Sequence, residues 1–251
     1  MFPQGLIRTY QCHGLKGMRL LLSYYRQRAV SLVKGPGREC PICNWRGKEF
    51  APFLNFKDNV TRSGAACPFC GALARHRAYH LFYERFFCAP ENEILKRMIH
   101  FAPESCLEPM LKCYMSEYVK SNYDHSGPDE KKYDLRDLPL PDAGYDVLVM
   151  NRVLSCTPED RKAAQSMYRV LRPGGVVLAG DLVSSGRPTI EYARIGYGGR
   201  RRSYGTLDLA ERFSPFEVSV MDASEFIEKT NRIFWGISSP EPIIILRKRA
   251  I

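Results

Sequence analysis

Two cysteine pairs in the first third of the chain could bind a metal ion. Their sequences are CPIC at residues 40–43 and CPFC at residues 67–70, with 23 residues between them. Each tight turn offers two thiolates, and four sulfurs fill a tetrahedral shell without leaving a position for water. This paired spacing predicts a structural zinc ion held by Cys40, Cys43, Cys67 and Cys70. The alternatives are an iron centre of the rubredoxin type, which has the same ligands, and free or redox-active cysteines.

The segment between the pairs is aromatic and lacks a long helical pattern, which favours the short strands of a zinc ribbon. We interpret the scattered remaining cysteines as small core or surface residues, namely Cys12, Cys88, Cys106, Cys113 and Cys156. Metal-binding cysteine pairs are typical of a reducing compartment, so a cytoplasmic protein is expected. No apolar run approaches the roughly 18 residues of a membrane span, and no signal-peptide pattern is recognisable at the N-terminus.

A basic stretch precedes the first cysteine pair. Residues 1–38 contain seven Lys or Arg and no Asp or Glu, and residues 16–34 have the pattern of a basic amphipathic helix that ends at Gly35-Pro36-Gly37. Packing of the apolar face on the rest of the protein is the usual reason for such a pattern. The alternative is peripheral contact of the basic face with a membrane surface or an anionic lipid-linked substrate.

A helix is expected directly after the second pair, over residues 72–87. Its first turns carry Arg75, His76 and Arg77. These side chains could grip an acidic group of a cofactor or substrate, or they could form a solvated first turn. On the first interpretation Arg75 and Arg77 bind substrate and His76 is a candidate catalytic residue.

A strand–helix–strand unit is the clearest structural pattern. The apolar run at residues 147–150 indicates a strand buried on both faces, and small and apolar residues at helical spacing follow from 163 to 171. Pro158 suits the first turn of that helix, and the sequence RPGG at 172–175 ends it before a second buried strand at 176–179. Such a unit is parallel and right-handed. A further strand, turn and helix are expected over residues 98–111, and two closing strands over 216–221 and 242–246.

The residues of these segments carry a resemblance. The segment YDVLVMNRVLSCTPEDRKAAQSMYRVLRPGG resembles the fourth strand, helix and turn of class I S-adenosylmethionine (SAM) dependent methyltransferases. The combination of the cysteine pairs, RHR, HFAPE at 100–104 and DLRDLP at 134–139 is similar to a bacterial family of these enzymes with an N-terminal zinc ribbon. The likeness runs from about residue 40 to 245. A different Rossmann-like enzyme is the alternative.

The resemblance implies an α/β fold, a Rossmann-like class I methyltransferase sheet flanked by helices with a small zinc-ribbon module. The expected domains are a basic segment at 1–38, the ribbon and connecting helix at 39–90, and the methyltransferase domain at 91–251. The glycine-free HFAPE turn would replace the usual glycine-rich cofactor loop. The implied SAM-binding residues are His100, Phe101, Ala102, Pro103, Glu104, Asp124, Asp134, Leu135 and Asn151.

Among these, Asp124 follows the strand expected at 117–120 and would accept hydrogen bonds from the ribose hydroxyls. Asp134 would lie by the adenine amine, with Leu135 against the ring. Both aspartates could instead be ordinary loop or helix-cap residues.

The chain departs from the family after the fourth strand. Members often have HVLEH there, whereas this sequence has RVLSC at 152–156, and Ala74 replaces an acidic residue before RHR. If either of the missing histidines acts as a general base in the family, this sequence has no histidine at that position to do so. The catalytic candidates are His76, Asn151 and Tyr204.

An arginine-rich insertion follows the fifth expected strand. Residues 184–204 contain five Arg and the single acid Glu191. Arg200, Arg202 and Tyr204 could hold a phosphate, carboxylate or nucleotide, because guanidinium groups make bidentate contacts with such anions. A mobile solvated loop is the alternative.

The formal net charge of +10 also favours an anionic partner. The expected function is transfer of a methyl group from SAM to oxygen or nitrogen of a small acceptor, a sugar, sugar-nucleotide or natural-product intermediate. An RNA methyltransferase with a zinc ribbon and a non-catalytic scaffold of the same fold are the alternatives.

Overall fold

We describe the protein from a computed structural model. It describes residues 14–15, 17–19, 21–26, 28–29, 31, 33, 35, 37–55, 60–123, 127, 129–237 and 239–250. The chain forms two compact units. One comprises Met1–Ala78 with Ile227–Ser239, and the other comprises Tyr79–Phe226 with Pro240–Ile251. The division between the units falls between Ala78 and Tyr79, and a late segment, Ile227–Ser239, belongs to the N-terminal unit. The expected domain boundaries at 38 and 90 remain a prediction.

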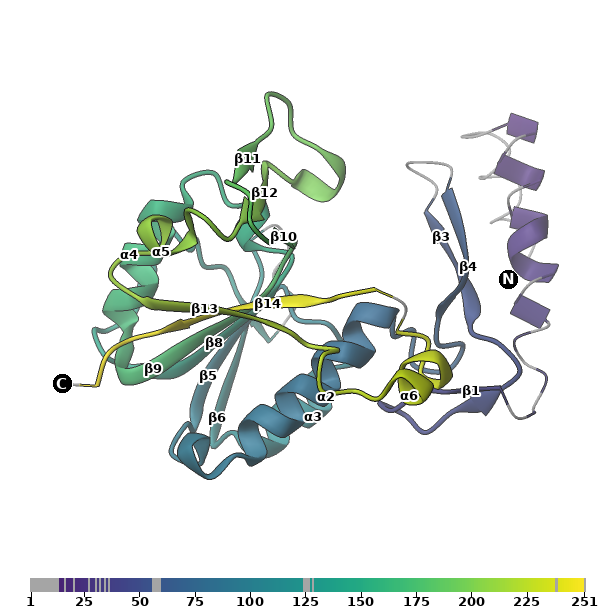
Figure 1. Cartoon of the computed structure of the whole chain (residues 1–251), viewed down its shortest axis with the longest axis horizontal. Helices are drawn as coiled ribbons and strands as arrows, with labels where there is room; N and C mark the ends of the chain where they lie inside the picture. Colours follow the sequence, from purple (N-terminus) through teal and green to yellow (C-terminus); the bar gives the residue numbers. More distant parts are fainter. Residues whose placement is uncertain are drawn as a thin grey trace. The chain divides into compact units, whose positions relative to one another are not determined.

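A seven-stranded sheet is the centre of the second unit (Figure 1). Its strands are β5 (Arg97–Phe101), β6 (Glu117–Ser121), β7 (Glu130–Lys131), β8 (Tyr145–Asn151), β9 (Leu171–Gly180), β13 (Glu217–Asp222) and β14 (Pro242–Arg247). They lie in the order β13-β14-β9-β8-β5-β6-β7. The strands from β7 to β9 pair in parallel, whereas β14 is antiparallel to both neighbours. This sheet confirms the predicted α/β fold and its closing antiparallel pair.

The predicted strand–helix–strand unit is β8, α4 (Asp160–Val170) and β9. Every residue of β8 is buried, as its continuous apolar run predicts. Ala163, Met167 and Val170 of α4 are fully buried against the sheet. Two details differ from expectation: the short helix η2 (Leu154–Cys156) precedes α4, and Pro158 lies before the helix instead of in its first turn.

Helices cover both faces of this sheet (Figure 1). From residue 38 on, the described chain also contains the helices α2 (Ala74–Cys88), η1 (Pro90–Asn92), α3 (Glu108–Tyr114), η3 (Tyr197–Gly199), α5 (Leu209–Arg212) and α6 (Lys229–Phe234). Helix α2 begins in the first unit and continues into the second, where Tyr79, Tyr83 and Phe87 are buried at helical spacing.

The arginine-rich insertion forms a small sheet of its own. Strands β10 (Val183–Ser184) and β11 (Ile190–Glu191) pair with β12 (Arg202–Gly205). The Arg202 side chain is only 4% exposed, and its guanidinium lies 2.9 Å from Glu191 and donates to the carbonyl oxygens of Thr157 (2.6 Å) and Pro158 (2.9 Å).

Tyr204, on the same strand, is also fully buried. Its hydroxyl donates to Asp160 at the start of α4 (3.1 Å). The structure therefore does not support a substrate role for Arg202 or a substrate or catalytic role for Tyr204. Both residues fasten the insertion to the sheet's crossover helix.

The first unit contains two hairpins and α6. The hairpins are β1 (Arg38–Glu39) with β2 (Arg46–Gly47), and β3 (Ala51–Asn55) with β4 (Val60–Ala66). These are the short strands expected around the cysteine pairs. The described residues from 14 to 31 are helical, with Leu21 buried but Leu22 61% exposed. Within the described parts of the chain, no helix is both long and apolar enough to cross a bilayer.

The burial of Arg202 leads to a prediction about stability. Arg202→Met leaves the carbonyl oxygens of Thr157 and Pro158 without their donor, although Asp160 keeps Arg212 at 2.9 Å, so we expect a loss of about 3 kcal/mol in the free energy of unfolding. Urea denaturation followed by circular dichroism measures this loss. Arg194→Met, at an exposed position of the same insertion, is the control and should change stability by about 0.5 kcal/mol or less. Equal stability of both variants would contradict the assignment of Arg202 as an anchor.

Candidate cofactor site and four-cysteine cluster

A network of hydrogen-bonded side chains lies at the carboxyl ends of β5 and β8. In open α/β sheets this edge is where ligands bind. His100 of β5 is fully buried, with its Nδ1 2.7 Å from the Tyr118 hydroxyl and its Nε2 3.1 Å from Oε2 of Glu104. Because a carboxylate only accepts, Nε2 carries the proton and Nδ1 accepts from Tyr118 when Glu104 is ionised.

Asn151, the last residue of β8, extends this hydrogen-bond network. Its Nδ2 donates to the same Glu104 oxygen (3.1 Å), and its Oδ1 accepts from the hydroxyl of Tyr83 in α2 (2.8 Å). Burial raises the pKa of Tyr83 and of Tyr118, and the charge of Glu104 acts in the same direction. Both phenols therefore stay protonated as donors, and they fix the orientations of the Asn151 amide and the His100 ring.

The turn after β5 adopts a conformation that usually requires glycine. Ala102 has φ +48°, in the left-handed region, and is exposed, whereas Pro103 and Glu104 are half-buried. Arg152, directly after β8, also has a positive φ of +60°. Strained backbone of this kind is concentrated at functional sites. The glycine-free turn thus follows a glycine-like path at the edge where a cofactor would bind.

Gly180, at the end of β9, permits the third strand to approach. A Cβ at this position would lie 2.4 Å from Oδ1 of Asn151 and 2.5 Å from the ring of Tyr79. Only glycine leaves room for both neighbours, so the packing of β9 depends on the same asparagine that binds Glu104.

Sequence reasoning missed three polar residues of this edge. Tyr83 and Tyr118 look like ordinary core aromatics, since nothing local shows where their hydroxyls point. Ser121 ends β6 beside Phe101, is fully buried, and its Oγ has no hydrogen-bond partner among the described residues. The position of Ser121, a small polar residue at the end of a predicted strand, could have indicated that it belongs to this edge.

The other predicted cofactor residues are placed differently. Phe101 and Leu135 belong to the hydrophobic core. The Asp134 carboxylate binds the Arg136 guanidinium at 2.6 Å and 3.0 Å, and this hydrogen bonding lowers the pKa of Asp134. Asp124 lies outside the described residues. Contacts of these residues with a nucleoside remain predictions.

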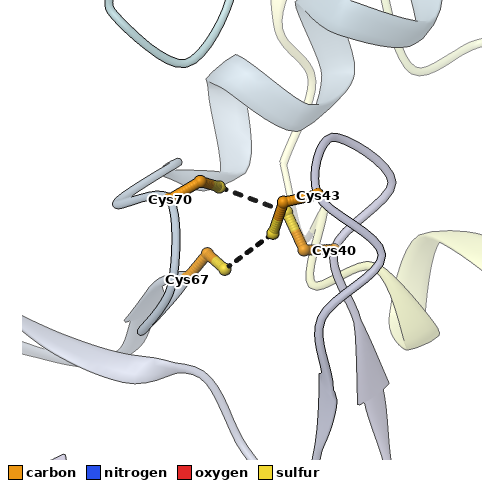
Figure 2. A group of neighbouring side chains, drawn as sticks. All are labelled: Cys40, Cys43, Cys67 and Cys70. Atoms are coloured by element: carbon orange, nitrogen blue, oxygen red, sulfur yellow. Dashed lines mark hydrogen bonds between the residues drawn. The ribbon is translucent and has the colours of Figure 1, made fainter.

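The four predicted metal ligands lie together in the first unit (Figure 2). All four Sγ atoms lie within 4.8 Å of one another, with Cys40 and Cys70 3.7 Å apart and Cys43 and Cys67 3.5 Å apart. A tetrahedron with metal–sulfur bonds of about 2.3 Å has sulfur–sulfur edges of about 3.8 Å. The cluster could therefore hold zinc.

The two cysteine turns have the same backbone hydrogen bonds. Asn44 N donates to Cys40 O and Gly71 N to Cys67 O, both at 2.9 Å. Asn44 and Gly71 follow their cysteine pairs at φ +57° and +73°. Asparagine and glycine tolerate this region best, so both turns present their sulfurs in equivalent ways.

Arg77 lies beside this cluster and is fully buried. Its guanidinium donates to the carbonyl oxygens of Ala72 (2.6 Å), Trp235 (2.6 Å) and Gly236 (3.1 Å) and stacks 3.9 Å from the centre of the Phe50 ring. Burial lowers its pKa to about 10, while the three nearby thiolates favour its charged form. The structure does not support the predicted substrate contact, because every side of this side chain is occupied by protein.

The remaining candidates are Arg75, His76 and Arg200. His76 is buried, and its Nδ1 accepts a long hydrogen bond from Leu73 N (3.3 Å). Arg75 and Arg200 are half-buried. His76 and Arg75 belong to the first unit and Asn151 to the second, so a joint catalytic role remains a prediction.

Part of the chain is similar to a known family. Residues 99–179, which extend from within β5 to within β9 and include His100, Glu104 and Asn151, match the family model of a methyltransferase domain. The match places a methyltransferase domain over these strands. No curated protein matches the sequence.

Three solved structures are similar to this chain at low sequence identity, and the first two share its fold. A SAM-dependent methyltransferase from Mesorhizobium loti has 13% identity and a TM-score of 0.50, with coverage of 70% of this chain and 99% of that chain. The [4+2]-cyclase SpnF has 14% identity and a TM-score of 0.53, covering 92% and 94%. The Burkholderia thailandensis 1,6-didemethyltoxoflavin-N1-methyltransferase, solved with S-adenosylhomocysteine, has 14% identity and a TM-score of 0.48, covering 70% and 78%.

The conformation of Ala102 can be tested by two substitutions. Ala102→Val places a β-branched residue at a positive φ and should lower the free energy of unfolding of the methyltransferase domain by about 1–3 kcal/mol. Ala102→Gly should leave stability within about 1 kcal/mol of the original. Thermal and urea unfolding measure both. The matched control is Ala89→Val, since Ala89 has φ −72° and ψ 131°, a region that valine prefers. A larger loss for Ala89→Val than for Ala102→Val would contradict the assigned backbone conformation.

Proposed function

We propose that this protein transfers the methyl group of SAM to an oxygen or nitrogen of a small-molecule acceptor. The observation that carries the proposal is the Glu104 carboxylate, held by His100 and Asn151 at the ends of adjacent parallel strands in a methyltransferase domain. When bound, SAM supplies an activated methyl group on a sulfonium ion. The protein's task is then to orient the acceptor and to receive its proton.

The cofactor would be held by residues of three strand ends. Ala102 and Pro103 expose backbone for close approach, and the Glu104 carboxylate suits the ammonium group of the methionine portion. The buried Ser121 Oγ offers a polar atom beside Phe101, and Asp124, Asp134 and Leu135 remain proposed for the nucleoside.

The residues near the acceptor are proposed with different roles. Asn151 is a candidate to orient the acceptor, since Tyr83 fixes its amide. Cys156 is an unsuitable base, because burial and the nearby charge of Asp181 raise the pKa of its thiol. His76 therefore stays the candidate for receiving the proton. For the acceptor we retain the proposal of a sugar, sugar-nucleotide or natural-product intermediate.

We further propose that the four-cysteine cluster forms a zinc ribbon with a structural zinc ion. Four sulfur ligands at tetrahedral spacing leave no place for substrate, so the ion would stabilise the fold and not take part in the reaction. The eight described cysteines form no disulfide, which supports a reducing compartment, and we propose the cytoplasm.

Cofactor binding is tested by calorimetric titration with SAM and S-adenosylhomocysteine. We expect micromolar binding, and an at least tenfold higher Kd for Glu104→Gln, because this change removes the negative charge while an amide oxygen can still accept from His100 and Asn151; tenfold equals about 1.4 kcal/mol. Glu108→Gln is the matched control, since Glu108 binds surface lysines of α3 and β6. Circular dichroism verifies folding of both variants. A folded protein that binds neither ligand would refute the proposal and favour the non-catalytic scaffold.

Metal analysis of the purified protein tests the cysteine cluster. We expect one zinc ion per chain and its loss in Cys43→Ser, with a lower unfolding temperature, because the ion's binding energy contributes to folding. Cys113→Ser, at an exposed cysteine outside the cluster, should retain the metal. Iron in place of zinc, or full zinc content in Cys43→Ser, would contradict this assignment.

A further inference from the structure

Three arginines gather around the segment that follows β8 at the ligand-binding edge of the methyltransferase sheet. Arg152 directly follows Asn151, and Arg201 N, in the insertion, donates to Ser155 O (2.8 Å). The Cys156 thiol donates to the carbonyl oxygens of Arg152 (3.3 Å) and Gly198 (3.4 Å). The insertion therefore folds back onto residues 152–156 and brings its arginines to this edge.

The electrostatics of Cys156 support this placement. The charges of Arg200 and Arg201 lower the pKa of the Cys156 thiol, against the larger effects of burial and of Asp181. The backbone agrees with this, since a Cβ placed on Gly199, next to Arg200, would lie 4.0 Å from the Cys156 sulfur. Among the described residues, no ion pair links Arg200 or Arg201 to a carboxylate, whereas the neighbouring Arg202 binds Glu191 and Asp160.

Arg152 is the third cation of this group, and one of its N–H donors has no hydrogen-bond partner among the described residues. Its Nη2 lies 2.9 Å from Glu241, but its Nη1 is buried and has no hydrogen-bond partner among the described residues. A buried N–H group without an acceptor is unfavourable. The residue also holds a left-handed backbone, with φ +60°. Arg152 thus keeps hydrogen-bonding capacity that the described fold does not use, on a side chain that is 26% exposed beside Asn151.

The acidic groups at this edge are bound by residues other than Arg200 and Arg201, since Glu104 accepts from His100 and Asn151. Asp181 is buried, and its two oxygens accept from Ser155 N (2.9 Å) and Leu182 N (2.8 Å). Glu241 is 7% exposed and holds one side of Arg152. Among the described residues the half-buried Arg200 and Arg201 therefore have no carboxylate at ion-pair distance, although acids lie at the same edge.

We propose that Arg152, Arg200 and Arg201 bind an anionic group of the methyl acceptor, a phosphate or a carboxylate. Guanidinium groups bind both anions in bidentate geometry. Glu241 is a positioning residue, which holds the partly exposed Arg152 guanidinium at this edge through Nη2. This inference rests on the proposed function and narrows its acceptor to an anionic compound.

The test uses three probes that share one sugar: glucose 1-phosphate, glucuronate and uncharged glucose. Each is titrated calorimetrically into the zinc-replete protein saturated with S-adenosylhomocysteine. We expect at least one anionic sugar to bind at least tenfold more tightly than glucose. The preferred anion distinguishes a phosphate from a carboxylate. Binding that is equal for all three sugars would overturn the proposal.

Substitutions assign the binding to these residues. Arg152→Met should raise the Kd of the preferred anionic sugar at least tenfold and leave that of S-adenosylhomocysteine unchanged. Because this variant breaks a buried ion pair, the double variant Arg200→Met/Arg201→Met provides a second test outside that pair, with the same expected result. Arg187→Met, at an exposed position of the insertion, is the control. Anion binding that survives both variants would overturn the proposal, whereas absent binding of S-adenosylhomocysteine would instead refute the methyltransferase function.

Discussion

The carboxylate of Glu104 is the interaction on which the ligand-binding edge depends. It accepts from a β5 side chain and from a β8 side chain, and each of these donors is oriented by a tyrosine hydroxyl behind it. These contacts give hydrogen-bond partners to five polar side chains, namely Glu104, His100, Asn151, Tyr118 and Tyr83. Loss of the carboxylate would leave the fully buried His100 without its acceptor, and an unsatisfied buried donor costs about 1–3 kcal/mol. The Glu104 carboxylate thus fixes the orientations of the side chains at this edge without a bound ligand.

The same constraint extends to the third strand. Gly180 has no space for a side chain because Asn151 and Tyr79 occupy it, and Arg152 N donates to Gly180 O (2.7 Å). The polar contact on one side of Asn151 and the steric contact on the other therefore fix a single arrangement of β5, β8 and β9. Ala102 and Arg152 have strained backbone conformations. This strain is tolerated because the contacts of Asn151 and Gly180 fix the positions of the strands that precede them.

Much of this architecture could be predicted from local sequence. The fully apolar run at 147–150 specifies a doubly covered strand, and the cysteine spacing specifies the cluster. Long-range partners could not be predicted in this way. Arg202 and Arg77 look like surface cations, yet each is buried by residues distant in sequence, Asp160 in one case and Trp235 in the other. The return of residues 227–239 to the first unit has no local pattern at all.

The two buried arginines also differ in how their charge is balanced, and this difference bears on the metal. Arg202 has two carboxylates within ion-pair distance. Arg77 binds only carbonyl oxygens and an aromatic ring, and no carboxylate pairs with it among the described residues. A buried cation needs a counter-charge nearby. Four thiolates around one divalent ion are net negative, and three of the four cysteines act on Arg77. The proposed metal-bound cluster would therefore supply the counter-charge of a buried guanidinium that neutral thiols would leave unbalanced.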